Sequence, residues 1–123
     1  MTEHALPAGV NAIFSVPEAE IMHEAVPAEE TVSGQPTQGS VALGDFANSK
    51  FGVWELRKGT VTDTEVEEIS VIVSGSATIE FLAGPGAGET LQVAAGDVPR
   101  LAEGAQTRWT VTDHVRKVYF IEN

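Results

Sequence analysis

The chain has 123 residues, a formal net charge of −11 and no cysteine. The length suits one domain with a single core, and the lack of cysteine excludes disulfides, thiolate nucleophiles and zinc–thiolate sites. Nucleic-acid binding depends on Lys and Arg that neutralise phosphates, yet none occurs before Lys50. We therefore expect neither a nucleic-acid nor a membrane partner. No apolar run approaches the ~20 residues that span a bilayer, and no basic-then-apolar leader is present, so a cytoplasmic protein is expected.

Residues 1–40 predict an irregular N-terminal arm ahead of a domain that covers residues 41–123. Prolines and glycines recur through the arm, and its sequence is rich in turn residues. Residues 12–16 resemble a short strand, and residues 16–23 could form one helical turn with Pro17 at its start. We expect the arm to lie along the domain or across a partner subunit, with a disordered arm as the alternative.

From residue 51 onward, short alternating apolar runs predict an all-β domain. Turn residues separate the runs, including Gly84–Gly88 and a two-residue hairpin connection at Thr112–Val115. Connections this short require antiparallel pairing. The expected strands are residues 51–57, 68–74, 77–82, 89–93, 97–101, 106–112 and 115–121.

Two glycine-anchored segments, Gly59–Gly75 and Gly96–Trp109, resemble the two motifs of the cupin superfamily. In that superfamily, two histidines and a glutamate of the first motif and a histidine of the second bind a divalent metal ion. Aligned on the last glycine of the first segment, Glu68 takes the place of the motif glutamate. The three histidine positions are then occupied by Thr62, Thr64 and Thr107.

This substitution argues against a metal centre. Residues two apart on a strand point to the same side, but a threonine hydroxyl is a weak ligand where imidazole is a strong one. A register slipped by one residue would offer Asp63, Glu65 and Glu67 instead, but these alternate residues are expected to point outward. The sequence therefore predicts a cavity with no tightly bound metal and no cofactor.

The order of further motifs around Trp54, Gly75, Asp97, Trp109 and Tyr119 resembles one group of cupins. These are the small single-domain cupins related to ethanolamine-utilisation and ureidoglycine-processing proteins. The match covers roughly residues 51–121. The resemblance implies a cupin jelly-roll barrel of two antiparallel sheets, usually assembled as a homodimer. It implies little about activity, because a fold does not fix a function.

The candidate site centres on Glu68, which would act as a general base or acid in an enzyme and as a hydrogen-bond acceptor in a binding protein. Indole faces can pack on a sugar ring or an ammonium group, although both tryptophans could instead fill the core. On the first strand, either Trp54 or its neighbours Glu55 and Arg57 face the interior, and Lys117 and Tyr119 reach either the cavity or a subunit interface. The candidate ligand-binding residues are Thr62, Thr64, Thr107, Trp109, Trp54, Arg57 and Tyr119.

The remaining chemical groups give no second site. His4, His23 and His114 match no cupin ligand position and are expected on the surface, and no base can be placed beside Ser70, Ser74 or Ser76. We therefore expect a homodimeric protein that binds a small polar metabolite in its barrel. The alternative is a metal-independent enzyme of the isomerase, epimerase or lyase type that uses Glu68.

Overall fold

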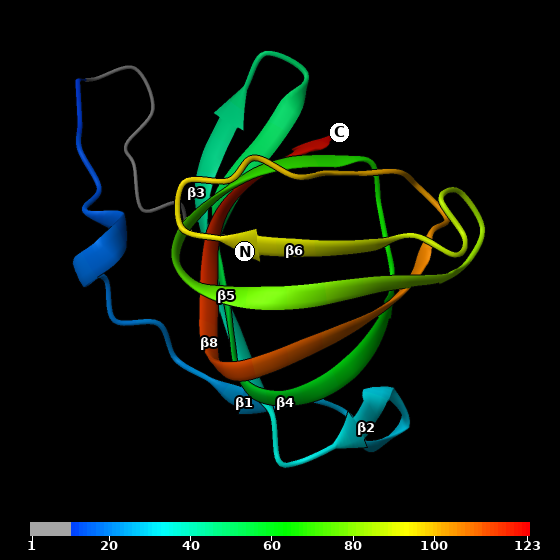
Figure 1. The fold of residues 1–123 in the computed structure, drawn as a ribbon. Helices are drawn as coiled ribbons and strands as arrows, with labels where there is room; N and C mark the ends of the chain where they lie inside the picture. Colours follow the sequence, from blue (N-terminus) through cyan, green and yellow to red (C-terminus); the bar gives the residue numbers. More distant parts are fainter. Residues whose placement is uncertain (1–10) are drawn as a thin grey trace.

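The computed structural model describes residues 11–123 and is almost entirely β-sheet (Figure 1). None of the described segments is a helix long and apolar enough to cross a membrane. In chain order the elements are the 3-10 turn η1 (Val16–Glu18), β1 (Glu24–Ala25), the 3-10 turn η2 (Ala28–Glu30), β2 (Thr31–Ser33), β3 (Thr37–Phe46), β4 (Ser49–Thr64), β5 (Glu68–Ala83), β6 (Thr90–Ala94), β7 (Arg100–Leu101) and β8 (Gln106–Glu122).

Three long strands, β4, β5 and β8, bend and thereby contribute to two sheets. The register of β4 against β8 shifts between Arg57 and Gly59, and that of β5 against β8 shifts between Gly75 and Thr78. Before and after these bulges the strands have different neighbours. The first sheet contains β1, β3 and β7, and the second contains β2 and β6. All pairs are antiparallel, and the expected all-β jelly-roll barrel is confirmed.

Because β5 and β8 bend at their bulges without ending, each of them contains two of the strands that the sequence predicted. The predicted strands 68–74 and 77–82 are both part of β5, and those at 106–112 and 115–121 are both part of β8. The hairpin expected at Thr112–Val115 is wrong, because the chain continues there as a bulged strand. Gly75 has φ +76°, and a Cβ atom at this position would collide with the carbonyl oxygen of His114. Glycine therefore lets β5 turn the corner in close contact with β8.

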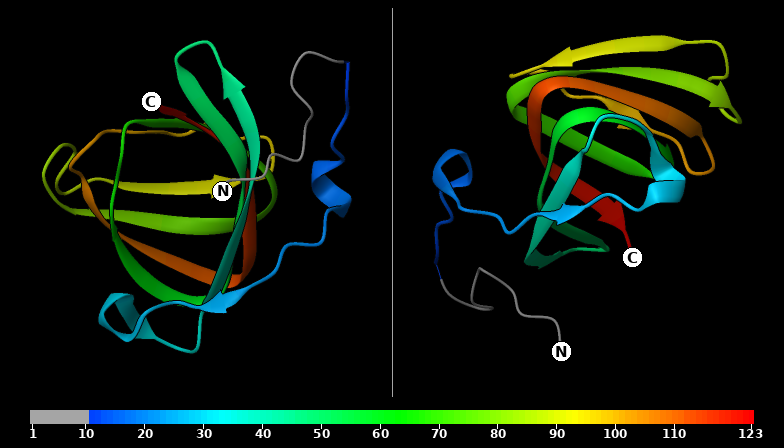
Figure 2. Two further views of the ribbon diagram at one scale, coloured as in Figure 1. Left: turned by 180° about the vertical axis from the view of Figure 1, so that it is seen from behind. Right: turned by 90° about the horizontal axis from the view of Figure 1, so that it is seen from below.

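The arm lies along the outside of the first sheet and adds strands to the barrel (Figure 2). The helical turn expected near Pro17 is present as η1, whereas residues 12–16 do not form the expected strand. Ile21 packs with Leu43 and Val53 in a small core on this outer face. β3 begins before residue 40 and pairs with β4, so the arm is continuous with the sheet.

The main core lies between the two sheets. Leu56, Ile72, Ile79 and Leu101 are fully buried there. Side chains on successive residues of a strand alternate between the barrel interior and its outer surface. Apolar residues fill one end of the interior, and polar side chains gather at the other end, where the barrel opens.

Candidate binding cavity

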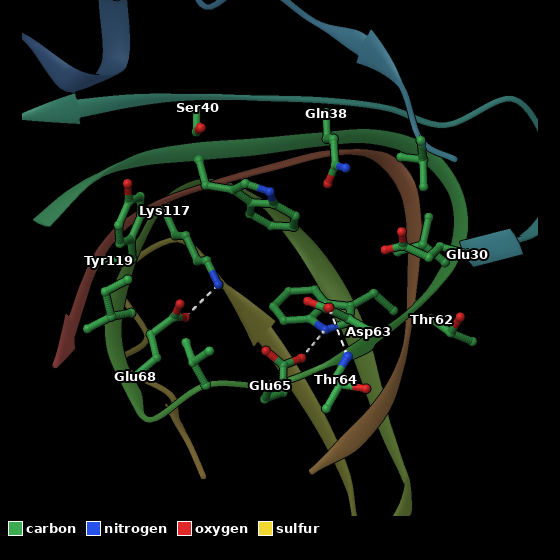
Figure 3. A pocket seen from close by; sticks show the side chains of 16 residues that line it. Glu30, Gln38, Ser40, Thr62, Asp63, Thr64, Glu65, Glu68, Lys117 and Tyr119 are labelled. Atoms are coloured by element: carbon green, nitrogen blue, oxygen red, sulfur yellow. Dashed lines mark hydrogen bonds and ion pairs between the residues drawn. The ribbon is translucent and has the colours of Figure 1, made fainter. Parts of the chain in front are cut away.

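The open end of the barrel holds a cavity of about 400 Å³ (Figure 3). This volume lies within the range of small-molecule sites, which is roughly 300–1,000 Å³. Its walls combine two indoles, several aliphatic side chains, and a group of hydroxyls and carboxylates. The lining residues are Val26, Glu30, Gln38, Ser40, Trp54, Val61, Thr62, Asp63, Thr64, Glu65, Val66, Glu68, Trp109, Lys117, Tyr119 and Ile121.

A buried ion pair crosses one side of the cavity. Lys117 Nζ donates to Glu68 Oε2 at 2.6 Å, and the two side chains are only 6% and 9% exposed. The same ammonium lies 4.7 Å from the ring centroid of Trp54 and 5.0 Å from that of Trp109. Such distances allow cation–π attraction. Lys117 therefore faces the cavity, which resolves the choice that the sequence left open.

The two indoles both fill the core and line the cavity. Trp109 is buried, and Trp54 packs against it edge to face, with ring centroids 5.5 Å apart. Trp54 faces the interior, and so Glu55 and Arg57 face the outside. The Arg57 side chain is 56% exposed and pairs with Glu55 at 3.4 Å. The expectation that Arg57 binds a ligand in the cavity is therefore wrong, because its position on β4 puts it on the opposite face from Trp54.

The interior register of β4 differs by one residue from the expected one. Asp63 lies opposite Thr107 and Val61 opposite Trp109, and residues directly opposite in an antiparallel pair share a face. Thr62 and Thr64 line the rim, but their side chains point away from the cavity in Figure 3. Asp63, at the solvent-exposed rim, and the buried Glu65 thus line the cavity where the sequence predicted threonine hydroxyls.

Glu65 is the clearest residue that the sequence interpretation placed wrongly. It follows the end of β4, and its backbone N–H donates to Ala105 while its carbonyl accepts from Gly104. These bonds turn its side chain inward, so that it is buried. Glu65 Oε2 accepts hydrogen bonds from Thr107 Oγ1 at 2.6 Å and from Trp109 Nε1 at 3.0 Å. Thr107 is accordingly buried against Glu65 and does not line the main cavity.

Burial and neighbouring negative charges raise the pKa of several acidic groups that line the cavity. Desolvation, followed by the negative charge of Glu65, raises the pKa of Asp63 to about 6. Asp63 lies at the solvent-exposed rim, so water limits the free energy that this shift can contribute. Burial also raises the pKa of Glu68 against the opposing effect of Lys117. Desolvation and the charge of Glu68 raise the pKa of Tyr119.

His23 does not lie at the surface where it was expected. His23 is buried between Thr37 and Glu55, and Glu55 also accepts a hydrogen bond from Arg116 Nε at 2.8 Å. Burial raises the pKa of Glu55, but the hydrogen bonds from Arg116 and His23 outweigh burial, so the pKa of this carboxyl is lowered. This network fastens the arm to the barrel. His4 lies outside the described residues.

His114 lies beside a serine on the bulged part of β8. Its Nε2 atom is 3.0 Å from Ser74 Oγ, and its Nδ1 atom is 2.6 Å from Asp113 Oδ2. This places a base next to Ser74, which the sequence alone did not predict. Asp113 is 89% exposed, and none of the three residues lines the barrel cavity. The arrangement therefore lacks an enclosed substrate site.

The jelly-roll barrel with a polar cavity at its open end is that of a cupin. Residues 43–119 match the family model of the EutQ-like cupin domain, and the chain belongs to this family. The comparison with curated protein sequences gave no significant match.

Solved structures share the fold. The Clostridium difficile EutQ protein is 15% identical, with a TM-score of 0.64 over 89% of this chain and 85% of that one. A putative ethanolamine utilization protein of Salmonella typhimurium is 17% identical, with a TM-score of 0.58 over 80% and 77% of the two chains. A protein of unknown function from Pseudomonas syringae is 24% identical, with a TM-score of 0.68 over 85% of this chain and 45% of that one. At these identities the comparisons show the fold alone.

The donor set at the cupin metal position does not fit the metal centre that the superfamily implies. Among residues 11–123 no imidazole lines the cavity, and Glu68, at the position of the motif glutamate, is already bonded to the Lys117 ammonium. In the part of the chain that the structure describes, no three His, Cys, Asp or Glu side chains are grouped as a metal site.

Proposed function

We propose that the barrel cavity binds a small polar organic molecule without a tightly bound metal ion. The observation that carries this proposal is the convergence of two indoles, four carboxylates and a buried ammonium on one open cavity of about 400 Å³. Buried polar groups in a cavity fix the orientation of a ligand, and aromatic faces supply contact area. A cytoplasmic location is part of the proposal.

The test uses the tryptophans as reporters. The chain contains two tryptophans, Trp54 and Trp109, and both line the cavity, so indole fluorescence reports on this site alone. We expect at least one class among sugars, amines and ureides to change the fluorescence saturably and to raise the melting temperature. Elemental analysis should find no stoichiometric metal in the purified protein. A stoichiometric metal would contradict the metal-free part of the proposal.

A metal-independent enzyme is the second candidate, and the raised pKa of Glu68 is the observation that favours it. A raised pKa lets a carboxylic acid hold its proton at a higher pH, which suits it to proton transfer. Glu68→Gln should abolish turnover of a bound compound if Glu68 acts as the acid or base, and should only weaken binding otherwise. Glu80→Gln is the control, because Glu80 pairs with Arg108 outside the cavity.

We also propose a homodimer. Ile69 and Phe120 lie opposite each other on neighbouring strands with 49% and 37% of their surfaces exposed, and Phe51 stacks on Phe120 at 5.7 Å. An exposed apolar group of this kind on a sheet face supports association with a second copy. Phe120→Asp should shift the mass measured by light scattering towards the monomer. Phe46→Asp, at an exposed end of β3, should not, and a wild-type monomer would refute the proposal.

A further inference from the structure

The cavity carries more negative than positive charge. Among the described residues that line it are four carboxylates and a single basic side chain, Lys117. The ammonium of Lys117 is matched by Glu68. Within residues 11–123, no ion pair involves Glu30, Asp63 or Glu65. Three acidic groups therefore remain without a cation.

Glu65 is the acidic group for which this imbalance matters most. It is 6% exposed, and its two hydrogen-bond donors, Thr107 and Trp109, are neutral and both bind Oε2. No hydrogen bond within the described chain reaches Oε1, and the Glu65 side chain lines the cavity (Figure 3). A buried carboxylate without an opposite charge is unfavourable. A bound cation would supply that charge.

The surroundings of Lys117 indicate which kind of cation suits this cavity. The Lys117 ammonium lies between two indole rings and a carboxylate, at 4.7 and 5.0 Å from the ring centroids. Glu65 and Asp63 are on the other side of the same cavity. Ammonium groups bind well where carboxylates and aromatic faces meet.

We propose that the ligand of this cavity is a small organic amine, bound as its ammonium ion by Glu65 and Asp63 with its carbon skeleton against Trp54 and Trp109. This inference rests on the proposed function and names the ligand class. The space and the apolar parts of the wall favour an organic cation over a bare metal ion. A metal ion needs several oxygen ligands gathered around one point, and the described residues contain no such group of three.

The test compares benzylamine, benzyl alcohol and benzoate, which share a ring and differ in the charge of one substituent. Binding to the full chain is followed by tryptophan fluorescence and by the indole N–H signals in ¹H–¹⁵N NMR. The Trp109 signal is informative because its N–H donates to Glu65. We expect benzylamine to bind at least about tenfold more tightly than the alcohol or the acid, and to shift the Trp109 signal.

Two variants connect this preference to the carboxylates. Glu65→Gln keeps an oxygen that can accept from Thr107 and Trp109 but removes the charge, and should abolish the preference for the amine. Asp63→Asn should reduce the preference for the amine. Because Asp63 lies at the rim, this variant tests the inference even if Glu65→Gln folds poorly. Glu89→Gln, in the exposed loop after β5, is the matched control and should leave the preference unchanged.

The outcomes separate this inference from the proposed function. If the alcohol or the acid binds as tightly as benzylamine, the amine inference is wrong and the proposed function stands. An amine preference that survives in both Glu65→Gln and Asp63→Asn would also overturn it. If no compound of any class changes either indole, the proposed function itself fails. Displacement of benzylamine by one equivalent of a divalent metal would overturn both.

Discussion

The Lys117–Glu68 pair should be a strong determinant of stability, and Lys117→Met tests this. Methionine keeps much of the unbranched side chain but removes the ammonium, which leaves the Glu68 carboxylate buried at 9% exposure without its partner. Loss of one member of a buried ion pair destabilises proteins by about 3–5 kcal/mol. We expect a loss of this size in the free energy of unfolding, measured by urea denaturation at pH 7.

Arg100→Met is a matched control. Arg100 Nη2 and Glu67 Oε2 are also 2.6 Å apart, but these side chains are 72% and 31% exposed. Solvent screens an exposed pair, so its removal should leave the free energy of unfolding nearly unchanged. The two variants thus compare ion pairs of equal length that differ in burial.

The pH dependence supplies a second, independent measurement. Burial raises the pKa of Glu68 above its ordinary value of 4.5, and removal of Lys117 should raise it further. A group whose folded pKa is raised binds its proton more readily in the folded protein, so stability grows as the pH falls through that pKa. The deficit of Lys117→Met should therefore shrink between pH 7 and about pH 5.

The double variant Lys117→Met/Glu68→Leu should recover most of the lost stability, because it leaves no unpaired charge. If Lys117→Met proves as stable as Arg100→Met, the pair contributes little and the reasoning is wrong. A deficit that stays constant with pH would contradict the assignment of the loss to an unpaired Glu68.

Three further predictions concern the frame around the cavity. Arg116→Met should speed hydrogen exchange in residues 16–19, because Arg116 donates to backbone carbonyls there. Gly75→Ala should lower the free energy of unfolding by more than about 3 kcal/mol, since a Cβ has no room. Gly96→Ala, with positive φ but open space, should cost only about 1–2 kcal/mol. Ser70→Ala should change stability by less than about 1 kcal/mol, because the buried Ser70 hydroxyl has no partner among the described residues.

The sequence predicts the barrel well because its signals are local. Glycines at corners and strict alternation within a strand depend on neighbouring residues only. Alternation predicts that Glu68, Ser70 and Ile72 share the interior face, and that Thr107 and Trp109 do so too. All five residues are buried in the structure. Within β5 and β8, turn residues at the bulges predict that each strand ends there. The strands continue, because both halves of each one are paired with neighbouring strands.

The centre of the site depends on information that the sequence pattern lacks. Lys117 and Glu68 are 49 residues apart, and only the register between β5 and β8 brings them together. The inward turn of Glu65 follows from the end of β4 at Thr64, after which alternation no longer applies. The motif alignment predicts the wrong face for Asp63, because it is one residue out of register with the observed pairing of β4 and β8.

The charge balance of the cavity leads to a last prediction, which reverses the usual effect of a destabilising substitution. In the wild-type protein, the Lys117 ammonium occupies the indole faces and neutralises Glu68. Lys117→Met frees the indole faces and Glu68, so an added organic ammonium ion can take the place of the lysine ammonium. Benzylamine should bind this variant more tightly than the wild type, by about tenfold, which corresponds to about 1.4 kcal/mol.

Thermal shift measures this rescue directly, because a ligand that binds only the folded state stabilises it by mass action. At equal concentration, benzylamine should raise the melting temperature of Lys117→Met by more than that of the wild type. Lys117→Arg keeps the positive charge and should show no such gain, and benzyl alcohol should stabilise the two proteins equally. If Lys117→Met binds benzylamine no better than the wild type does, then Lys117 and the ligand do not compete for the same surroundings. Glu68 would in that case serve the fold alone, and the amine site would be confined to Glu65 and Asp63 on the other side of the cavity.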